Sequence, residues 1–534
     1  MNTRPILKNK VYLYLTEFFA GVSVMAVELG ASRLLAPYFS SSQIVWTIII
    51  GTIMIAMALG NLWGGRMADK DPNTDKLYKR LLIAAVWIAA IPVLGKYVIL
   101  GISGLLVLTV STNFLIIAAF CACMVIFVYP LFLLGTVTPS LVKYTVDSLD
   151  DSGKTVGTLG AFNTIGSILG TFLPTFVTIP TVGTAVTFLL FSGILLAIGL
   201  IYFLSSKAGL RACVIALALF VLCAVLGNSN SFAFWDKSLV YEGESVYNYL
   251  QVKEQPDRMI LSTNVLFGVQ SVMMKEDGLT GMYYDYALAG PVMAENPYQN
   301  ARPRILVLGN GTGTYARQCA RYFPSAQVEG VEIDDKITDL AYTYFDMPDT
   351  VDVTTYDGRA YLQASDLSYN VILVDAYQDI TIPFQMSSVE FFSLVKEHLA
   401  PGGIMVVNLN MHSDGEGSIN QALCDTIASL FPSVYTADVP GTTNRELFAA
   451  LDGDPAQWLR EKWGGVDDAE LAGHLRTVSD RLTPYQGGDH ILTDDQAPVE
   501  LLGMRAIDGL IREEIGYYQN IYREQGISGL IDAF

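Results

Sequence analysis

Residues 305–334, ILVLGNGTGTYARQCARYFPSAQVEGVEID, are the most informative segment for the fold of the second half of this chain. Four apolar residues lead into the glycine-rich turn GNGTG at 309–313, a helix-like segment follows, and a second short strand ends on Glu332. Glycines let the backbone approach a bound ligand closely, and an acid at the tip of the next strand can accept hydrogen bonds from both hydroxyls of a ribose. This order predicts the nucleoside-binding half of a doubly wound sheet. The alternative is a tight turn followed by a solvated acid.

Two further carboxylates follow later strands of the same predicted sheet. Asp357 comes after a third β-rich run, where it can accept the amino group of an adenine while the backbone N–H of Gly358 meets a ring nitrogen. The run YNVILVD, residues 369–375, is typical of a buried strand and ends on Asp375. Because open α/β sheets bind ligands at the carboxyl ends of their strands, we expect these groups to lie near the glycine turn.

These motifs resemble a known family. GNGTG, VEID, DGRAYL, YNVILVDAYQD and LAPGGIMVVN look like the catalytic domain of spermidine synthases, the polyamine aminopropyltransferases, which share the class I S-adenosylmethionine methyltransferase fold. The resemblance covers residues 240–435. It implies an α/β Rossmann-like domain preceded by a small β-subdomain. It also implies decarboxylated S-adenosylmethionine, or S-adenosylmethionine itself, as co-substrate.

The resemblance also assigns site residues. It implies a donor-binding set, which is Gly309, Gly311, Thr312, Gly313, Glu332, Asp357, Gly358, Asn248 and Pro383. It implies an acceptor-binding set, which is Tyr283, Tyr284, Gln270 and Asp379. The sequence departs from the family pattern at three of these positions: Thr312 replaces an acid that holds the donor's amine, Tyr284 replaces His or Gln, and Asn248 replaces Gln. Adenosyl binding is therefore better supported than aminopropyl specificity. We also read the tyrosines as residues at strand ends, where a core or rim role is an equal alternative.

Asp375 matches the catalytic aspartate of the family and is our candidate general base. Alkyl transfer from a sulfonium releases a neutral thioether, so the leaving side needs no acid, but the attacking amine must be unprotonated. An alkylamine with a pKa near 10 is almost entirely protonated at pH 7. A carboxylate beside the sulfonium can orient the amine and accept its proton. The alternative is that Asp375 only caps the following helix.

The first part of the chain has a different character. Of its 534 residues, 51% are hydrophobic and only 16% are charged, which is too apolar for an ordinary soluble protein. Long apolar runs with few charges predict seven membrane spans. They lie near residues 11–32, 42–63, 82–101, 112–135, 157–179, 183–204 and 212–227. The last run is short, and the first run is read as a retained helix instead of a signal peptide.

Charge separates the two parts and bears on orientation. The first 228 residues hold 14 Lys and Arg against 8 Asp and Glu, whereas the remainder hold 19 against 44. Twelve of those 14 basic residues lie at the N-terminus and in the second, fourth and sixth loops, which the positive-inside rule places in the cytoplasm. Seven spans would then put the catalytic domain outside. On chemical grounds we expect it inside, at the inner (plasma) membrane, with one span miscounted.

Two acids inside the first span are unusual. Glu17 and Glu28 are 11 residues apart in the sequence, so they share one face of a helix. Intramembrane carboxylates are costly and often functional, which indicates a path for a cationic amine. The alternative is structural pairing, for instance of Glu28 with Arg33.

The predicted organisation is a membrane domain at 1–228, a small β entry subdomain at 229–300 and a Rossmann-like domain at 301–534 with a C-terminal helical insertion and tail. Three functions compete: a membrane-anchored aminopropyltransferase acting on a polyamine, another S-adenosylmethionine-dependent transferase such as a methyltransferase, and a polyamine transporter with a ligand-sensing domain. The expected partners are a cationic amine and the lipid bilayer, with a homo-oligomer left open. No nucleic acid is expected. The histidines and cysteines form no metal-binding spacing, so no metal is expected either.

Overall fold

The structure is a computed structural model that describes residues 6, 10–145, 152–205, 209–228, 231–265, 268–295, 302–376, 382–410 and 415–533, without the side chains of 514, 518 and 527–533. The chain forms two compact units. Unit 1 comprises residues 1–235, 243–249 and 512–534, and unit 2 comprises 236–242 and 250–511. The predicted domain boundaries remain predictions.

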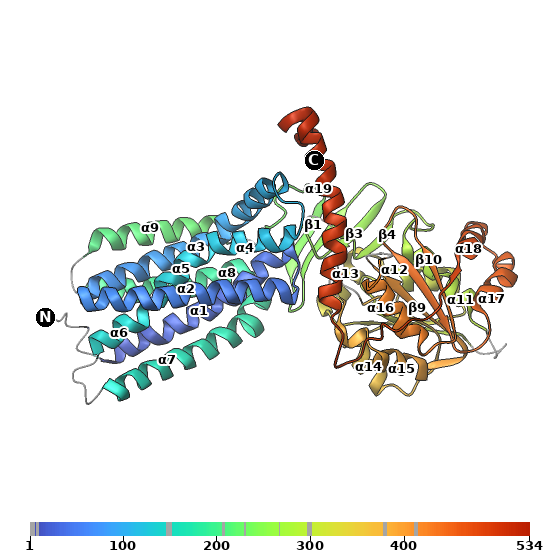
Figure 1. Ribbon diagram of the computed structural model, residues 1–534, viewed down its shortest axis with the longest axis horizontal. Coiled ribbons are helices and arrows are strands. Elements are labelled where there is room, and N and C mark those ends of the chain that lie inside the picture. The colour runs from blue at the N-terminus through green and yellow to red at the C-terminus, as the bar shows by residue number, and fades with distance from the viewer. Residues whose placement is uncertain are drawn as a thin grey trace. The chain divides into compact units, whose positions relative to one another are not determined.

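Unit 1 is a bundle of apolar helices. Most of them run side by side with nearly parallel axes (Figure 1). Apolar side chains cover both the inward and the outward faces, as expected of helices surrounded by hydrocarbon. The helices are α1 (Lys10–Phe39), α2 (Gln43–Lys70), α3 (Thr74–Val107), α4 (Phe114–Ile126), α5 (Val128–Gly135), α6 (Val137–Thr145), α7 (Ser152–Leu173), the π-helical turn η2 (Pro174–Thr178), α8 (Ile179–Ser205) and α9 (Leu210–Leu226).

Four helical segments of the described chain are long and apolar enough to cross a membrane, and a fifth is added if the bent pair 114–126 and 128–145 is one span. The run Ser152–Ser205 is counted once, although it has 54 residues. A helix of that length would span about 80 Å, far more than a bilayer of about 30 Å. The run breaks at Gly183, whose φ of 81° is not helical. The predicted count of seven spans stays a prediction.

The interior of unit 1 is tightly packed and contains one of the two unusual acids. Glu17 of α1 is fully buried. Its Oε1 accepts hydrogen bonds from Thr138 of α6 at 2.6 Å and from Asn163 of α7 at 2.8 Å. Gly166 of α7 lies against the Phe18 carbonyl, where a Cβ atom would not fit. The small residues of α7 thus allow the close approach on which these hydrogen bonds depend.

Unit 2 contains a small antiparallel sheet of four strands in the order β1-β2-β3-β4. The strands are β1 (Leu239–Glu244), β2 (Tyr249–Glu254), β3 (Arg258–Ser262) and β4 (Ser271–Met274). The tip of the first hairpin, residues 243–249, belongs to unit 1. Two short helices follow, α10 (Tyr283–Ala287) and α11 (Ala289–Met293). Tyr283 and Tyr284 therefore lie on a helix, so the expectation that they sit at strand ends was wrong.

The main sheet has eight strands in the order β12-β10-β11-β9-β8-β5-β6-β7. Strands β5 to β9 pair in parallel, whereas β11 and β10 pair antiparallel. The strands are β5 (Arg304–Leu308), β6 (Gln327–Glu332), β7 (Asp352–Thr355), β8 (Tyr369–Val374), β9 (Leu399–Leu409), β10 (Ser433–Asp438), β11 (Arg445–Ala450) and β12 (Thr483–Pro484). From β5 the chain first continues outward through β6 and β7, and then returns to place β8 and β9 on the other side of β5. Doubly wound sheets bind ligands at such a switch point between neighbouring strands. The predicted Rossmann-like fold is confirmed.

Helices cover both faces of the main sheet (Figure 1). Parallel strands buried on both sides read as continuous apolar runs, which explains why ILVL and YNVILV are strands despite lacking alternation. The remaining elements are α12 (Thr314–Tyr322), α13 (Asp335–Tyr344), α14 (Gly358–Ala364), η3 (Phe384–Met386), α15 (Val389–Glu397), α16 (Ile419–Ala428), α17 (Pro455–Lys462), η4 (Trp463–Gly465), α18 (Ala469–Arg481) and α19 (Val499–Ala533).

Candidate active site

The glycine turn between β5 and α12 has the backbone conformation that the sequence predicts. Gly309, Gly311 and Gly313 have φ values of 85°, 54° and 82°, which side chains with a Cβ atom rarely adopt. The surrounding atoms also leave no room for a side chain at two of these glycines. A Cβ at Gly309 would lie 2.5 Å from the carbonyl oxygen of Asp375, and one at Gly311 would lie 2.5 Å from the Ser271 hydroxyl. The turn is therefore packed directly against the segment that carries the candidate base.

Glu332 ends β6 and is buried, as the strand–acid spacing predicts. Its Oε2 accepts the backbone N–H of Gly311 at 2.8 Å, and its Oε1 accepts the N–H of Asp334 at 3.1 Å. Burial raises the pKa of Glu332 to about 7, partly offset by these bonds. The acid thus touches the glycine turn and gains further stabilisation of its charge when hydroxyl donors approach.

Asp357 and Gly358 lie beside Glu332. The N–H of Tyr356 donates to the Glu332 carbonyl at 3.0 Å, which places the end of β7 next to the end of β6. Asp357 caps α14 by accepting the N–H of Ala360 at 2.8 Å. A Cβ on Gly358 would lie 3.3 Å from the terminal methyl of Met386 and 3.6 Å from Leu308, so this position is closely packed against the sheet edge. The predicted adenine-binding pair is brought to the same edge as the glycine turn.

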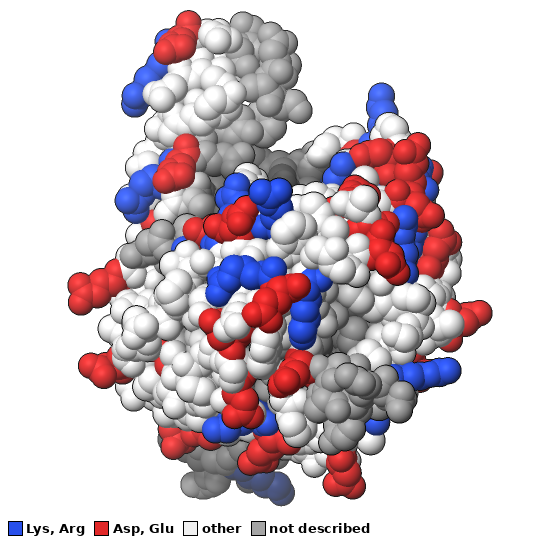
Figure 2. Space-filling model, turned by 90° about the vertical axis from the view of Figure 1, so that its right-hand side faces the viewer, with Lys and Arg blue, Asp and Glu red and all other residues white. Residues whose placement is uncertain are grey.

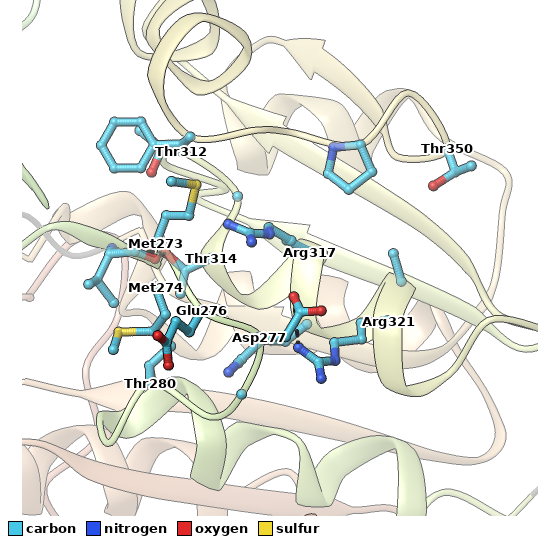
Figure 3. Close-up of a pocket in the computed structure, with 17 residues that line it drawn as sticks. Met273, Met274, Glu276, Asp277, Thr280, Thr312, Thr314, Arg317, Arg321 and Thr350 are labelled. Atoms are coloured by element: carbon cyan, nitrogen blue, oxygen red, sulfur yellow. Dashed lines mark hydrogen bonds and ion pairs between the residues drawn. The ribbon is translucent and has the colours of Figure 1, made fainter. Parts of the chain in front are cut away.

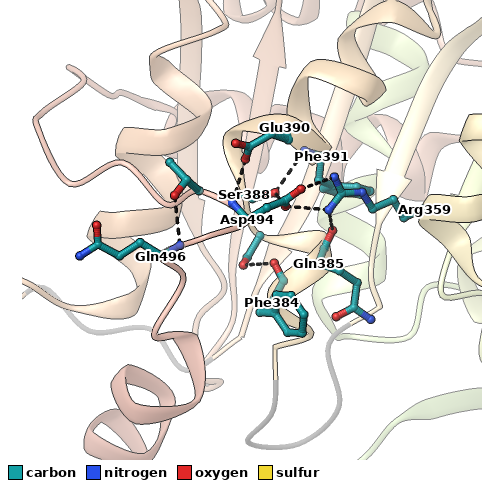
Figure 4. A network of polar contacts seen from close by, with 10 residues as sticks. Arg359, Phe384, Gln385, Ser388, Glu390, Phe391, Asp494 and Gln496 are labelled. Atoms are coloured by element: carbon teal, nitrogen blue, oxygen red, sulfur yellow. Dashed lines mark hydrogen bonds and ion pairs between the residues drawn. The ribbon is translucent and has the colours of Figure 1, made fainter.

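An ion-pair network fixes the start of α14 (Figure 4). Arg359 forms a bidentate pair with Asp494, at 2.7 and 2.6 Å, and also donates to the carbonyl of Gln385 at 3.0 Å. Ser388 donates to Asp494 at 2.5 Å. This network, which we call the tail clamp, links the C-terminal segment to α14 and to η3. Pro383 directly precedes η3, so the clamp holds both Gly358 and Pro383 in place.

Asp375 follows β8 and is held from two sides. Tyr283 of α10 donates to its Oδ2 at 2.7 Å, and the side chain of Asn408 on β9 donates to its Oδ1 at 2.8 Å. Asn408 is in turn held by Asn444, whose amide donates at 2.9 Å. Burial raises the pKa of Asp375 to about 7, and the charge of Glu332 contributes, while the bonds from Asn408 and Tyr283 oppose the rise. Asp375 is therefore oriented and has the proton affinity of a general base near neutral pH.

The acceptor-binding residues of the prediction are partly brought together. The rings of Tyr283 and Tyr284 lie 3.9 Å apart between centroids. The Tyr284 hydroxyl donates to the backbone carbonyl of Gln270 at 2.8 Å. Burial raises the pKa of both tyrosines, which keeps both hydroxyls protonated as hydrogen-bond donors.

Two predicted site residues are not placed with the others. Asp379 lies outside the described residues. Asn248 belongs to unit 1, which is described separately from the unit that carries the site.

Thr312 lines a separate cavity of about 350 Å³ behind the glycine turn (Figure 3). Its walls come from β4, from α12 and from the segment before β7. Arg317 and Arg321 reach toward this cavity, and Arg321 pairs with Asp277 at 3.1 Å. Neither Glu332 nor Asp375 lines it. The cavity is therefore distinct from the sheet edge where the candidate base lies.

Sequence reasoning missed Asn408, Asn444 and Ser271. Asn408 interrupts the apolar run IMVVNL at its carboxyl end, and a polar residue at that place in a buried strand was the available signal. Ser271 accepts the N–H of Thr312 at 3.1 Å, but nothing in its strand marked it out. Across the described ranges, no group of three or more His, Cys, Asp or Glu residues could hold a metal ion.

Comparison with known proteins identifies similar sequences. A family model of the spermine/spermidine synthase domain matches residues 283–448. A probable polyamine aminopropyl transferase of Bifidobacterium longum (strain NCC 2705) is 55% identical over 351 residues, which cover 62% of this chain and 78% of that protein. A polyamine aminopropyltransferase of Vibrio vulnificus (strain CMCP6) is 28% identical over 308 residues, covering 54% of this chain and 98% of that protein.

Among solved structures, a probable spermidine synthase from Corynebacterium glutamicum ATCC 13032 aligns with a TM-score of 0.36 and 22% identity, covering 47% of this chain and 98% of that chain. Spermidine synthase from Thermotoga maritima aligns with a TM-score of 0.35 and 18% identity, covering 43% and 79%.

Proposed function

We propose, from the premise that this chain belongs to the spermine/spermidine synthase family of polyamine aminopropyltransferases and is a transferase, that it moves an aminopropyl group to a cationic amine. The donor is decarboxylated S-adenosylmethionine and the acceptor is a polyamine. Glu332 holds the ribose, Asp357 and Gly358 hold the adenine, and the glycine turn lies along the rest of the adenosyl group. The proposed reaction uses no metal ion.

The observation that carries this proposal is the setting of Asp375. A base for an amine must be ionised at working pH and yet have an appreciable affinity for a proton. The raised pKa of Asp375, about 7, meets both needs. The hydrogen bonds from Tyr283 and Asn408 fix its two oxygens, and the packing against Gly309 places it beside the donor turn.

The proposed chemical step is a nucleophilic displacement at carbon. The amine nitrogen forms a bond to the methylene carbon next to the sulfonium sulfur, and the bond between that carbon and sulfur breaks with its electron pair going to sulfur. Methylthioadenosine leaves as a neutral thioether. The attacking nitrogen is uncharged because the acceptor's ammonium has first given one proton to the Asp375 carboxylate. The product leaves as a secondary ammonium, and Asp375 then releases its proton to solvent. The bonds to Asp375 keep its oxygen aimed at the attacking nitrogen, which reduces the entropy cost of alignment.

Net charge supports a cationic acceptor. Beyond residue 228 the chain carries 19 basic against 44 acidic residues. Figure 2 shows acidic side chains spread over one face of the molecule with basic ones between them. A negative field of this kind raises the local concentration of cations and speeds their association, more so at low salt.

We also propose that unit 1 anchors the enzyme in the inner membrane and that the catalytic unit is cytoplasmic. Four described helices are long and apolar enough to cross a bilayer, and many of their large apolar side chains are exposed. Such a surface is unfavourable in water and favourable in lipid. The donor nucleoside is made inside the cell, which supports the cytoplasmic side.

Methyl transfer is the alternative, because Thr312 stands where the family carries an acid for the donor's amine. Product analysis separates the two. The full chain in detergent is incubated with diaminobutane and either decarboxylated S-adenosylmethionine or S-adenosylmethionine, and the nucleoside product is identified by mass spectrometry. Methylthioadenosine is expected with the decarboxylated donor. S-adenosylhomocysteine as the main product, formed from S-adenosylmethionine, would contradict aminopropyl transfer and support a methyltransferase.

A further inference from the structure

The cavity behind the glycine turn takes no part in the mechanism above, although it is large enough for a small molecule. Its volume of about 350 Å³ lies within the range of about 300–1,000 Å³ that is typical of ligand sites. Its walls come from β4, α12 and the segment between α13 and β7, all of which belong to unit 2. Neither Asp375 nor Glu332 lines it, so it is separate from the pocket proposed for the donor and the acceptor.

Two buried polar side chains in the wall of this cavity have an unsatisfied oxygen. Thr312 is 2% exposed and Gln318 is 6% exposed. Neither Oγ1 of Thr312 nor Oε1 of Gln318 has a hydrogen-bond partner among the described residues. Burial of an unsatisfied polar atom is unfavourable, and such atoms are few in native proteins. A molecule bound in the cavity would supply a partner for both oxygens.

The contacts of Gln318 determine which partner its oxygen requires. Its Nε2 donates to Oδ1 of the buried Asp285 at 2.7 Å. Asp285 is itself fixed by hydrogen bonds from Thr280 and from the backbone N–H of Gly281. The amide oxygen of Gln318 can only accept, and the bond from its amide to a carboxylate makes that oxygen a stronger acceptor. This end of the cavity therefore favours an N–H donor, and a positively charged one most of all.

The neighbouring Arg317 requires the opposite charge. Figure 3 shows its side chain between those of Thr312 and Asp277. Asp277 is paired with the other arginine, Arg321, at 3.1 Å, whereas Arg317 has no ion pair within the ranges that the structure describes. A guanidinium is always charged, and its planar fork matches a carboxylate. Because Arg317 and Gln318 are adjacent on α12 and line one cavity, the anionic and cationic groups of a ligand must lie close together.

Apolar side chains form much of the remaining wall. Val272, Met273 and Phe345 line the cavity and are buried. They favour an apolar group on the ligand, and a methionine adapts its shape to such a group. Glu276 and Asp277 also line the cavity, and their negative charge makes a purely anionic ligand unfavourable.

We propose that this cavity binds an α-amino acid with an apolar side chain. In an α-amino acid the carboxylate and the ammonium group lie next to each other, as Arg317 and Gln318 require. The carboxylate pairs with Arg317, and the ammonium donates to Gln318 and to the hydroxyl of Thr312. The side chain packs against Val272 and Phe345. The proposal does not depend on the transferase function proposed above.

The test is isothermal calorimetry on the full chain in detergent, with leucine as the probe. The wild type is expected to bind leucine saturably, with a Kd of about 1 mM or tighter. 4-Methylpentanoate lacks only the ammonium group, so it should bind about tenfold or more weakly. Glycine lacks the apolar side chain and should also bind about tenfold or more weakly. Saturating methylthioadenosine should change the affinity for leucine by less than about threefold, because a separate site is only weakly coupled to the donor.

A charge-removing variant tests the assignment of Arg317. Arg317→Gln keeps a good helix former on α12, so the melting temperature and the affinity for methylthioadenosine should not change. Its affinity for leucine should fall by about tenfold or more, the effect of one charge-assisted bond. Arg460→Gln is the matched control, because Arg460 lies on α17 and does not line the cavity. It should bind leucine as the wild type does.

Four outcomes would overturn the proposal. They are the absence of saturable leucine binding, displacement of leucine by methylthioadenosine, equal affinity for leucine and either analogue, and equal affinity of Arg317→Gln and the wild type for leucine. The proposed transferase activity fails separately, if the wild type forms no methylthioadenosine from decarboxylated donor.

Discussion

At the scale of single residues, two carboxylates share one electrostatic setting at the sheet edge. Burial raises the pKa of both Glu332 and Asp375 to about 7, and the charge of Glu332 adds to the rise at Asp375. Their partners differ in kind. Glu332 accepts two backbone N–H groups, whereas Asp375 accepts side-chain donors on β9 and α10. Glu332 is thus fixed by the sheet edge itself, while Asp375 depends on two elements packing correctly.

The base role of Asp375 predicts both a mutational and a pH effect. Asp375→Asn keeps the shape but cannot accept a proton, so turnover should fall by roughly 10²–10⁴, with adenosyl affinity unchanged within a few-fold. In the wild type, Asp375 is protonated below its raised pKa and ionised above it. Turnover should therefore fall about tenfold per pH unit below about 7. Steady-state kinetics across pH would measure this.

The control for Asp375 is Tyr283→Phe, which removes one hydrogen bond to Asp375 but leaves the carboxylate in place. The bond favours the ionised form, so its loss should move the acid limb of the pH profile to higher pH. A wild-type profile that is flat between pH 5 and 8, or normal turnover in Asp375→Asn, would place the chemistry elsewhere.

Glu332 should govern donor binding. Two charge-assisted bonds to ribose hydroxyls contribute on the order of 1.5–3 kcal/mol each, so Glu332→Ala should weaken binding of methylthioadenosine by about tenfold or more. Affinity in the wild type should also decrease below about pH 7, where Glu332 becomes protonated. Calorimetry tests both effects. Glu329→Ala, which removes an acid on the same strand that pairs with Arg304, is the control. Equal affinity of Glu332→Ala and wild type would refute the assignment.

At the scale of elements, the site depends on where short segments begin. Helix α12 begins directly after Gly313, whose positive φ lets the chain turn from β5, and α14 begins at Gly358 under the cap of Asp357. A seven-residue helix such as α14 has little stability of its own. The tail clamp on Arg359 therefore determines where its first turn lies.

The tail clamp predicts a binding effect at a distance from the donor. Asp494→Ala removes the bidentate partner of Arg359 and the acceptor for Ser388. The pair is partly exposed, so its net contribution is modest, and we expect methylthioadenosine to bind about threefold to tenfold more weakly, with turnover at saturation nearly unchanged. Glu254→Gln is the matched control, because it removes the Lys275–Glu254 pair on the small sheet. Equal effects of the two variants would show that the clamp is only structural.

At the scale of the whole molecule, one chain combines two units with opposite charge balance. The part before residue 229 is basic and apolar, and the rest is acidic. In unit 1 one carboxyl oxygen of the buried Glu17 is paired within the bundle, with Thr138 and Asn163. Such pairing is what a low-dielectric surrounding requires of a buried acid.

Orientation is tested by labelling. Single cysteines are placed at exposed Asp467 in unit 2 and at exposed Asp71 in the loop between α2 and α3, in a chain freed of its native cysteines. The positive-inside rule assigns the second loop to the cytoplasm. We expect both positions to resist a membrane-impermeant thiol reagent in intact cells and to react after lysis. Reaction of Asp467→Cys alone in intact cells would place the catalytic unit outside.

Much of the candidate site could be predicted because it lies close together in the sequence. The glycine turn, Glu332, Asp357 and Asp375 each occur at the carboxyl end of a predicted strand, and parallel strands bring such ends to one edge. The sequence did not reveal that Tyr283 bonds to Asp375, because that contact joins residues 92 positions apart. Nor did it show that the tyrosines lie on a helix, since packing against the sheet decides the conformation of so short a segment.

The fold class, the apolar first part and the acids at the sheet edge could all be predicted from residue patterns, because hydrophobic periodicity and glycine spacing are local properties. The hydrogen-bond partners of those acids become known only from the folded chain. Hydrogen bonds and burial, which set the pKa of Asp375, come from Asn408 and Tyr283 on other elements. Glu446 is a second example. The sequence shows only an acid within an apolar strand, and its position opposite Asn408 exists only once β11 pairs antiparallel with β9. The physical reason is that desolvation and cross-strand neighbours depend on distances in space.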